Sequence, residues 1–182
     1  FIHDRFLDVT THNDPEFDSF TYGDNCDVNA RARALRGVER GDLLLFLARL
    51  QNYRKELGEL TPLSKFGFYF VGFIHVDRIY RSVTDPLSTL DLEPINLNAH
   101  VRRAMADDSL WDSFWVFCGS SWSRRFKKAV PVTRELCEKI FTSADGSPWR
   151  WGGERTDLQV IGLSLIHISE PTRRTPISYA VF

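Results

Sequence analysis

The sequence predicts an α+β protein with a small, curved, mixed β-sheet flanked by short helices. Three apolar runs of strand length lie at residues 43–50, 66–80 and 113–118. The expected order is a helix, two strands, a helix, a strand, two helices and a last strand, which is not the strict alternation of a doubly wound sheet. The 182 residues are 43% hydrophobic, which is enough for the core of one domain.

The N-terminal third of the chain combines turn signals with one strong strand. Residues 1–24 are expected to be an extended loop with short strands, because Asn13-Asp14-Pro15 is a turn sequence. A helix is predicted over residues 28–36, capped by Asn25 or Asp27 and ended by Gly37. The Gly41-Asp42 turn leads into residues 43–50, whose continuous apolar run predicts a strand buried on both faces. Residues 52–65 are expected to be a charged loop.

The remaining elements follow from similar local signals. Residues 66–80 predict a long aromatic strand in which Gly72 marks a bulge or a close backbone approach. Asn98 is expected to cap a short helix over residues 99–106. Residues 113–118 predict a third strand, residues 124–129 a basic helical turn, residues 132–141 a helix and residues 157–163 a last strand.

Charge, cysteine content and apolar run length limit the class of protein. Lys and Arg number 23 against 24 Asp and Glu, which argues against a protein that coats DNA but leaves local nucleic-acid contact open. No apolar run approaches the roughly 18 residues of a membrane span, so no membrane partner is expected. Cys26, Cys118 and Cys137 form no CxxC pair, which argues against a zinc knuckle or a disulfide framework. With no signal peptide visible, we expect a cytoplasmic protein.

The C-terminal residues need separate treatment. Residues 164–182, SLIHISEPTRRTPISYAVF, resemble translated sequencing-adapter sequence that recurs at the ends of metagenomic reading frames. A genuine C-terminal strand is the alternative. We therefore expect a single domain over residues 1–163, with a natural chain that extends past both ends, and a non-native tail over residues 164–182.

The first candidate site is His12-Asn13-Asp14-Pro15-Glu16. In an extended segment, residues two apart point the same way, so His12, Asp14 and Glu16 could share one side. An imidazole and two carboxylates can bind a divalent metal or perform acid–base catalysis. Solvated side chains in an Asp-Pro turn are the simpler alternative.

Two further short segments carry candidate groups, each with an ordinary structural alternative. Tyr22-Gly23-Asp24 offers a stacking ring and a carboxylate, or is merely a turn. The segment from Asn98 to residue 103 offers a helix cap, an imidazole and two cations that could contact phosphate, or a solvated helical face. Its candidate residues are Asn98, His100, Arg102 and Arg103.

The strongest physical signal for nucleotide contact lies at residues 120–128, SSWSRRFKK. Hydroxyl and backbone N–H groups at the expected helix start would form an anion site, strengthened by four cations in five residues. Trp122 and Phe126 alternate with the charges, as in base-stacking surfaces. The nucleotide-binding candidates are Ser121, Ser123, Arg124 and Lys127, and an amphipathic surface helix is the alternative. The chain contains no GxSxG, P-loop, GxGxxG or HExxH motif.

Several stretches together resemble known families. The Gly41-Asp42 turn with its following strand, and FYFVGFIHVDRI, resemble the EVE, ASCH and PUA-like domains. HNDPEF, TYGD, VERGDLLLFLARL, NAH and the basic segment near residues 121–130 resemble the nucleotide modification associated domains, most closely the third, which are DNA base hypermodification proteins. An Arg-Lys-Gly-Phe-Asp type opening associated with the third domain is absent. The resemblance implies a PUA-like, partly open barrel and functional groups at His12, Asp14, Glu16, Tyr22, Asp24, Asn98, His100 and Arg124.

Three hypotheses of function remain. The first is a nucleotide or DNA base modification protein, of phage or bacterial origin, that binds a nucleobase or nucleic acid. A flipped base would stack on a tyrosine or tryptophan. The second is a metal-dependent enzyme that uses His12, Asp14, Glu16 and His100. The third is a non-catalytic reader of modified bases or an interaction module. The sequence predicts no particular cofactor.

Overall fold

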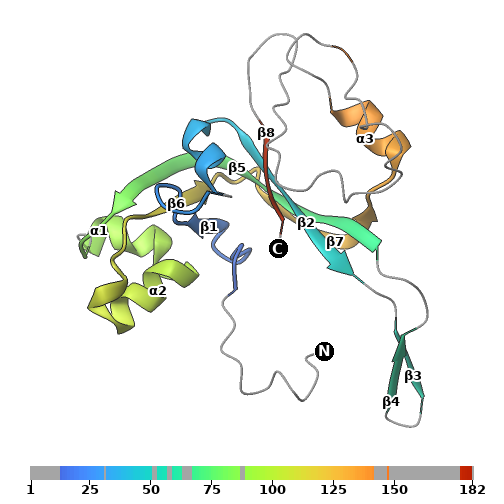
Figure 1. The fold of residues 1–182 in the computed structure, drawn as a ribbon, viewed down its shortest axis with the longest axis horizontal. Helices are drawn as coiled ribbons and strands as arrows, with labels where there is room; N and C mark the ends of the chain where they lie inside the picture. Colours follow the sequence, from blue (N-terminus) through green and yellow to red (C-terminus); the bar gives the residue numbers. More distant parts are fainter. Residues whose placement is uncertain are drawn as a thin grey trace.

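The computed structural model describes residues 13–30, 32–50, 53–56, 59–62, 67–86, 89–141, 147 and 177–181. The fold is α+β, as expected: a curled, mainly antiparallel sheet forms a half-barrel, and short helices pack against it (Figure 1). The strands of the sheet lie in the order β1-β6-β5-β2-β8, and β7 also pairs with β5. A separate hairpin of β3 (Tyr53–Glu56) and β4 (Glu59–Pro62) projects from the ends of β2 and β5.

The long strand β5 (Gly67–Val83) organises the sheet. Its first half pairs with β2 (Leu43–Leu50) on one edge. Along the other edge it pairs first with β7 (Arg124–Pro131) and then with β6 (Phe114–Gly119). Because Val76 pairs with Gly119 and Phe73 with Arg124, β6 and β7 are two parts of one antiparallel run, interrupted at residues 120–123. β1 (Thr21–Asp24) pairs with the far edge of β6.

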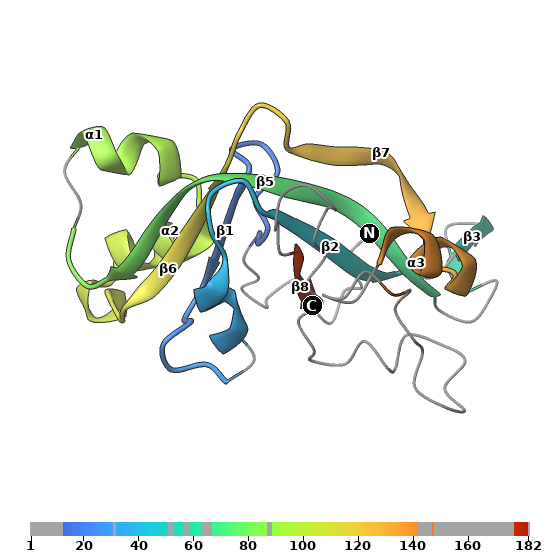
Figure 2. The same cartoon turned by 90° about the horizontal axis from the view of Figure 1, so that it is seen from above.

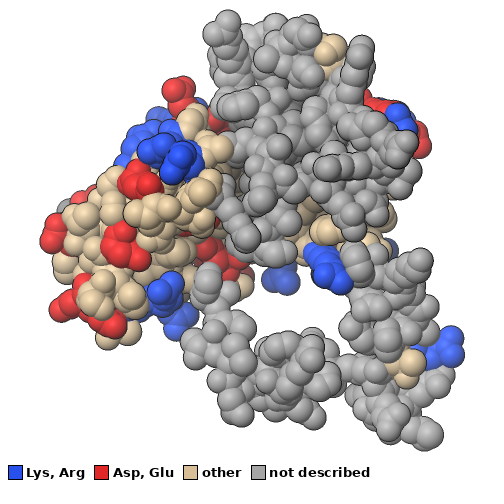
Figure 3. Space-filling model, in the orientation of Figure 1, with Lys and Arg blue, Asp and Glu red and all other residues tan. Residues whose placement is uncertain are grey.

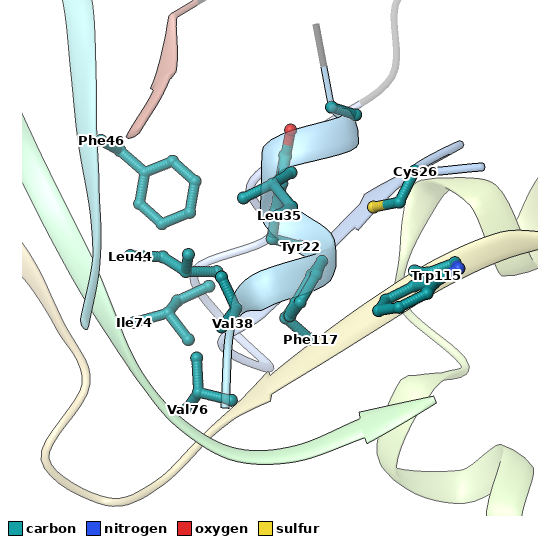
Figure 4. Close-up of a cluster of buried hydrophobic side chains, with 11 residues drawn as sticks. Tyr22, Cys26, Leu35, Val38, Leu44, Phe46, Ile74, Val76, Trp115 and Phe117 are labelled. Carbon is teal, nitrogen blue, oxygen red and sulfur yellow. The ribbon is translucent and has the colours of Figure 1, made fainter. Parts of the chain in front are cut away.

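The strands bury apolar side chains on both faces of the sheet. One cluster contains alternate residues of β2, β5 and β6 together with Tyr22, and the 3-10 helix η2 (Arg33–Gly37) packs over it (Figure 4). On β6, Trp115 and Phe117 face this cluster, whereas Phe114 and Val116 face a second one. Residues 43–50 were expected to be buried on both faces, which holds only in part. Leu44, Phe46 and Leu47 are buried, Leu43, Leu45 and residue 48 are partly buried, and the last two residues are exposed.

Short helices cover the opposite face at its two ends. Helix α2 (Ala99–Ala106) and the 3-10 helix η3 (Glu93–Ile95) pack on β6 and the end of β5, next to helix α1 (Thr89–Leu92) and the 3-10 helix η4 (Asp108–Leu110). Helix α3 (Arg134–Ile140), capped by Thr133, packs on β2 and β5 through Cys137 and the neighbouring Phe141. The helix predicted over 99–106 is found with these bounds, and Asn98 caps it as expected. The helix predicted over 132–141 is found as the shorter α3.

Gly72 has the role that the sequence predicted. The register of β5 shifts beside Gly72 against both β2 and β7. A Cβ atom at this position would lie 2.6 Å from the carbonyl oxygen of Arg124 and 2.6 Å from the Phe17 ring. The absence of a side chain thus lets β7 and the Phe17 ring approach the bulge.

Three secondary-structure predictions are wrong. The helix expected over residues 28–36 is only η2, because its buried residues Ala32, Leu35 and Val38 repeat every three residues, the period of a 3-10 helix. Residues 52–65 contain the β3–β4 hairpin instead of only a loop, with Glu56 opposite Glu59. The basic segment 124–129 is part of strand β7, since β5 offers an open edge and charged residues suit an edge strand.

Strand β8 (Ile177–Val181) lies in the tail expected to be non-native. It pairs in parallel with β2, on the edge that β5 leaves free. The domain boundary after residue 163 stays a prediction, and the strand predicted over residues 157–163 falls outside the described residues. No helix in the described part of the chain has the length and apolar content needed to cross a membrane.

Candidate functional site

A buried contact between an aspartate and a histidine joins the segment before β1 to the first turn of α2. Asp14 Oδ2 lies 3.5 Å from His100 Nε2, and the two side chains are 2% and 12% exposed. The other carboxylate oxygen of Asp14 accepts a hydrogen bond of 3.1 Å from the backbone N–H of Gly23. A carboxylate that orients a partly exposed imidazole is an arrangement suited to proton transfer.

Two residues bring β1 and α2 close enough for this contact. The buried Asn98 accepts a hydrogen bond from the His100 N–H at 3.0 Å and donates one to Thr21 Oγ at 3.4 Å, so the helix cap also fastens α2 to β1. At Gly23 a Cβ atom would lie 2.6 Å from Cδ2 of His100. The His100 ring can therefore lie directly on the backbone of β1. Asn98 and His100 are both at the site, with Asn98 used as the cap.

Glu16 makes its own set of hydrogen bonds. Its two carboxylate oxygens accept from the Asn13 side chain at 2.7 Å and from the Asp18 N–H at 2.8 Å. These bonds close the turn before β1, where Glu16 forms a backbone bridge with Thr21. Glu16 is buried, and its carboxylate serves this turn in the structure.

The predicted metal site includes one residue that the structure does not describe. His12 lies outside the described residues. Within the described residues, no group of three or more His, Cys, Asp or Glu side chains is placed to hold a metal ion. A shared site of His12, Asp14 and Glu16 stays a prediction.

Tyr22 and Asp24 lie on the other face of β1. Tyr22 is 2% exposed and packs between Phe46 and Phe117, with ring centroids 5.4 and 6.1 Å away. Its hydroxyl donates a 2.8 Å hydrogen bond to Asp24, and burial raises the pKa of Tyr22 well above its usual value. Asp24 also accepts from the Asn25 N–H and from the Asn29 side chain. The Tyr22 ring, predicted as a stacking surface, is thus a core residue in this structure (Figure 4).

A second polar cluster lies at the interruption between β6 and β7. The backbone N–H of Ser120 donates to the His75 carbonyl at 2.8 Å, and the His75 N–H donates to Ser123 Oγ at 3.1 Å. The side chains of His75 and Ser120 share a 2.7 Å hydrogen bond. The Trp122 indole lies against the His75 ring, with centroids 5.2 Å apart, and is 69% exposed.

The predicted cations are at the surface. Arg124 donates hydrogen bonds to the carbonyls of Ser121 and Ser123, which closes the turn. Ser121 is exposed and Ser123 is buried. Three further cations on β7 are exposed: Arg125, Lys127 and Lys128. The α2 residues Arg102 and Arg103 are also exposed. On the face drawn in Figure 3, acidic and basic side chains are interspersed over the described surface.

Sequence reasoning did not single out His75. The sequence did offer one indication, because His75 is a polar residue within the apolar run of β5. Its neighbours Ile74 and Val76 are fully buried. Its partners Ser120 and Trp122 are distant in the sequence, and only the pairing of β6 and β7 with β5 brings them together.

The fold and these two clusters define a class: an α+β protein whose curled sheet carries a buried aspartate–histidine pair beside β1 and an aromatic, basic turn beside β5. Residues 3–145 match the family described as nucleotide modification associated domain 3, and the chain belongs to this family. The resemblance seen in the sequence is confirmed, and the family description indicates a role in nucleotide modification. Neither a curated protein nor a solved structure matches the chain, so the PUA-like relationship stays a prediction.

Proposed function

We propose that this nucleotide modification protein binds a nucleobase or nucleic acid in the cytoplasm. The observation that carries the proposal is the row of exposed cations on β7: Arg124, Arg125, Lys127 and Lys128. Phosphate contacts supply most of the affinity and the positioning in protein–nucleic acid complexes. The three free, buried cysteines support a reducing compartment.

The shape of β7 supports phosphate contact along this strand. Gly72 pairs with Arg125 and Phe70 with Val130, so four residues of β7 (126–129) lie opposite the single residue Val71. This bulge bows β7 away from β5, as seen from above in Figure 2. Lys127 and Lys128 lie in the bulge and are exposed. They are therefore free to reach a phosphate backbone that follows the edge of the sheet.

The test is salt-dependent binding of labelled oligonucleotides, measured by fluorescence anisotropy with and without modified bases. Each phosphate neutralised contributes a slope of roughly 0.7–0.9 in log K against log salt. The double variant Lys127→Ala/Lys128→Ala should lower that slope by about 1–2. Lys139→Ala, an exposed lysine on α3 that pairs with Glu135, is the matched control. Absence of salt-dependent binding to every oligonucleotide would refute the proposal.

A second candidate function is an enzyme whose acid–base group is His100. The buried carboxylate of Asp14 favours it, since its contact with Nε2 orients the His100 ring. In the metal-dependent version of this hypothesis, His12 and Glu16 join the pair as ligands. Stoichiometric divalent metal that is lost in His12→Ala/Asp14→Ala would support that version. Metal-free protein with full activity would exclude it.

The non-catalytic alternative is a reader of modified bases. Under this hypothesis His100→Gln weakens binding, and no modified product forms with any oligonucleotide or nucleotide. If binding is unchanged in His100→Gln while product formation is lost, the enzyme hypothesis is favoured. Mass spectrometry of the recovered nucleosides separates the two.

A further inference from the structure

We infer that Trp122, supported by His75, is a stacking platform for an unpaired base, so the ligand of the β7 cations is single-stranded or carries an extruded base. This inference rests on the proposed function and adds the class of nucleic acid. It depends on the turn between β6 and β7, on the rings around Trp122 and on the adjacent cations.

The turn that carries Trp122 is fixed to the sheet at several points. Besides the three hydrogen bonds that join Ser120 and Ser123 to His75, the Trp122 N–H donates to Ser120 Oγ at 3.1 Å. The Ser123 N–H closes the turn on the Ser120 carbonyl at 3.0 Å. At Gly119 a Cβ atom would collide with Ser123 Oγ, so the glycine lets the turn fold back. Trp122 is thereby held at a defined position above β5.

The Trp122 indole contributes little apolar burial to the fold, and most of its surface is open to a ligand. Trp122 is 69% exposed, although burial of apolar surface stabilises a protein by about 25 cal/mol per Å². The neighbouring rings of β5 and β7 are close: Phe73 and Phe126 form an edge-to-face pair at 6.1 Å. His75 and Phe73 are two apart on β5 and share a face. The sheet thus presents a row of rings that ends in the exposed indole.

The chemistry of such a row selects unpaired bases. Aromatic side chains beside cations are the usual means by which proteins bind single strands, because every base has a face that can stack. Inside a duplex both faces of a base are covered by its neighbours, and a blunt end opens only one face of each terminal pair. Trp122 would therefore stack mainly on a base that is unpaired or extruded. Arg124 and Arg125 follow Trp122 in the chain and are exposed, which places positive charge next to the ring for the phosphates.

The experiment compares one DNA strand of about 12 nucleotides, its blunt duplex, and the same duplex with one bulged base. The proteins are the wild type, Trp122→Ala, Trp122→Phe and, as a control on charge, Lys127→Ala/Lys128→Ala. The wild type should bind the single strand and the bulged duplex more tightly than the blunt duplex. Trp122→Ala should weaken binding to those two ligands by about 5- to 150-fold, and Trp122→Phe should recover most of the loss. Thermal melting confirms that each variant is folded.

The outcomes separate this inference from the proposed function. If no ligand binds in a salt-dependent manner, both fail. If the lysine variant weakens binding but Trp122→Ala binds the single strand as tightly as the wild type, the stacking platform is wrong and the proposed function stands. If the blunt duplex binds as tightly as the single strand, the preference for unpaired bases is wrong.

Discussion

The substitution Gly72→Ala tests whether the bulge of β5 requires a glycine. The added Cβ would lie 2.6 Å from both the Arg124 carbonyl oxygen and a carbon of the Phe17 ring, whereas ordinary contacts begin near 3.4 Å. Each neighbour would have to move by about 0.8 Å. The carbonyl belongs to the backbone of β7, so that movement would separate two paired strands.

The size of the effect follows from this overlap. Overpacking by one methyl group costs about 1–3 kcal/mol, and the rigid backbone partner favours the upper half of the range. The lower chain entropy of Ala in the unfolded state offsets about 0.4–1 kcal/mol of this cost. We expect a net loss of about 2 kcal/mol and a Tm lower by about 4–8 °C.

Differential scanning fluorimetry and urea denaturation measure this loss, and the chain offers a matched control. Gly37 has no atom within 4 Å of its added Cβ and no positive φ, so Gly37→Ala should be neutral or slightly stabilising. If Gly72→Ala melts at the same temperature as Gly37→Ala, the close approach of β7 at Gly72 is wrong.

Three further predictions concern single residues near the site and the core. Burial raises the pKa of Asp42 from 3.8 to about 6, so the folded state binds this proton more tightly and stability falls as pH rises through that interval. Asp42→Asn should flatten this part of a pH–stability curve, and an unchanged slope would contradict the argument. Asn98→Ala removes the α2 cap and should lower the free energy of unfolding, measured by urea denaturation, by about 1 kcal/mol. Asn98→Ser keeps a capping oxygen and should lose less. Equal losses in the two variants would show that the cap contributes nothing. Gly23→Ala should displace His100 and lower the Tm more than Gly37→Ala, and an unshifted His100 ring signal in NMR would contradict it.

The elements that the sequence predicted correctly are those with strong local signals. The apolar run from Leu43 has the length of a strand, and the aromatic run to Tyr80 is rich in residues that favour strands. Asn98 before an apolar helical stretch is a cap by its own hydrogen-bonding chemistry. The segment 124–129 was wrongly predicted as a helix because its local pattern fits both structures, and the open edge of β5 decided between them.

Local sequence patterns were enough to predict the class of fold, the main strands, the irregularity at Gly72 and, through short motifs, the family. Which polar residues lie in contact could be seen only in the folded chain. Asp14 reaches His100, and His75 supports Trp122, through strand pairings between segments far apart in the chain. Propensity and periodicity act over a few neighbouring residues, whereas these contacts depend on the register and curl of the whole sheet. Burial likewise assigned Tyr22 to the core and left Trp122 exposed, although both are aromatic residues in short polar motifs.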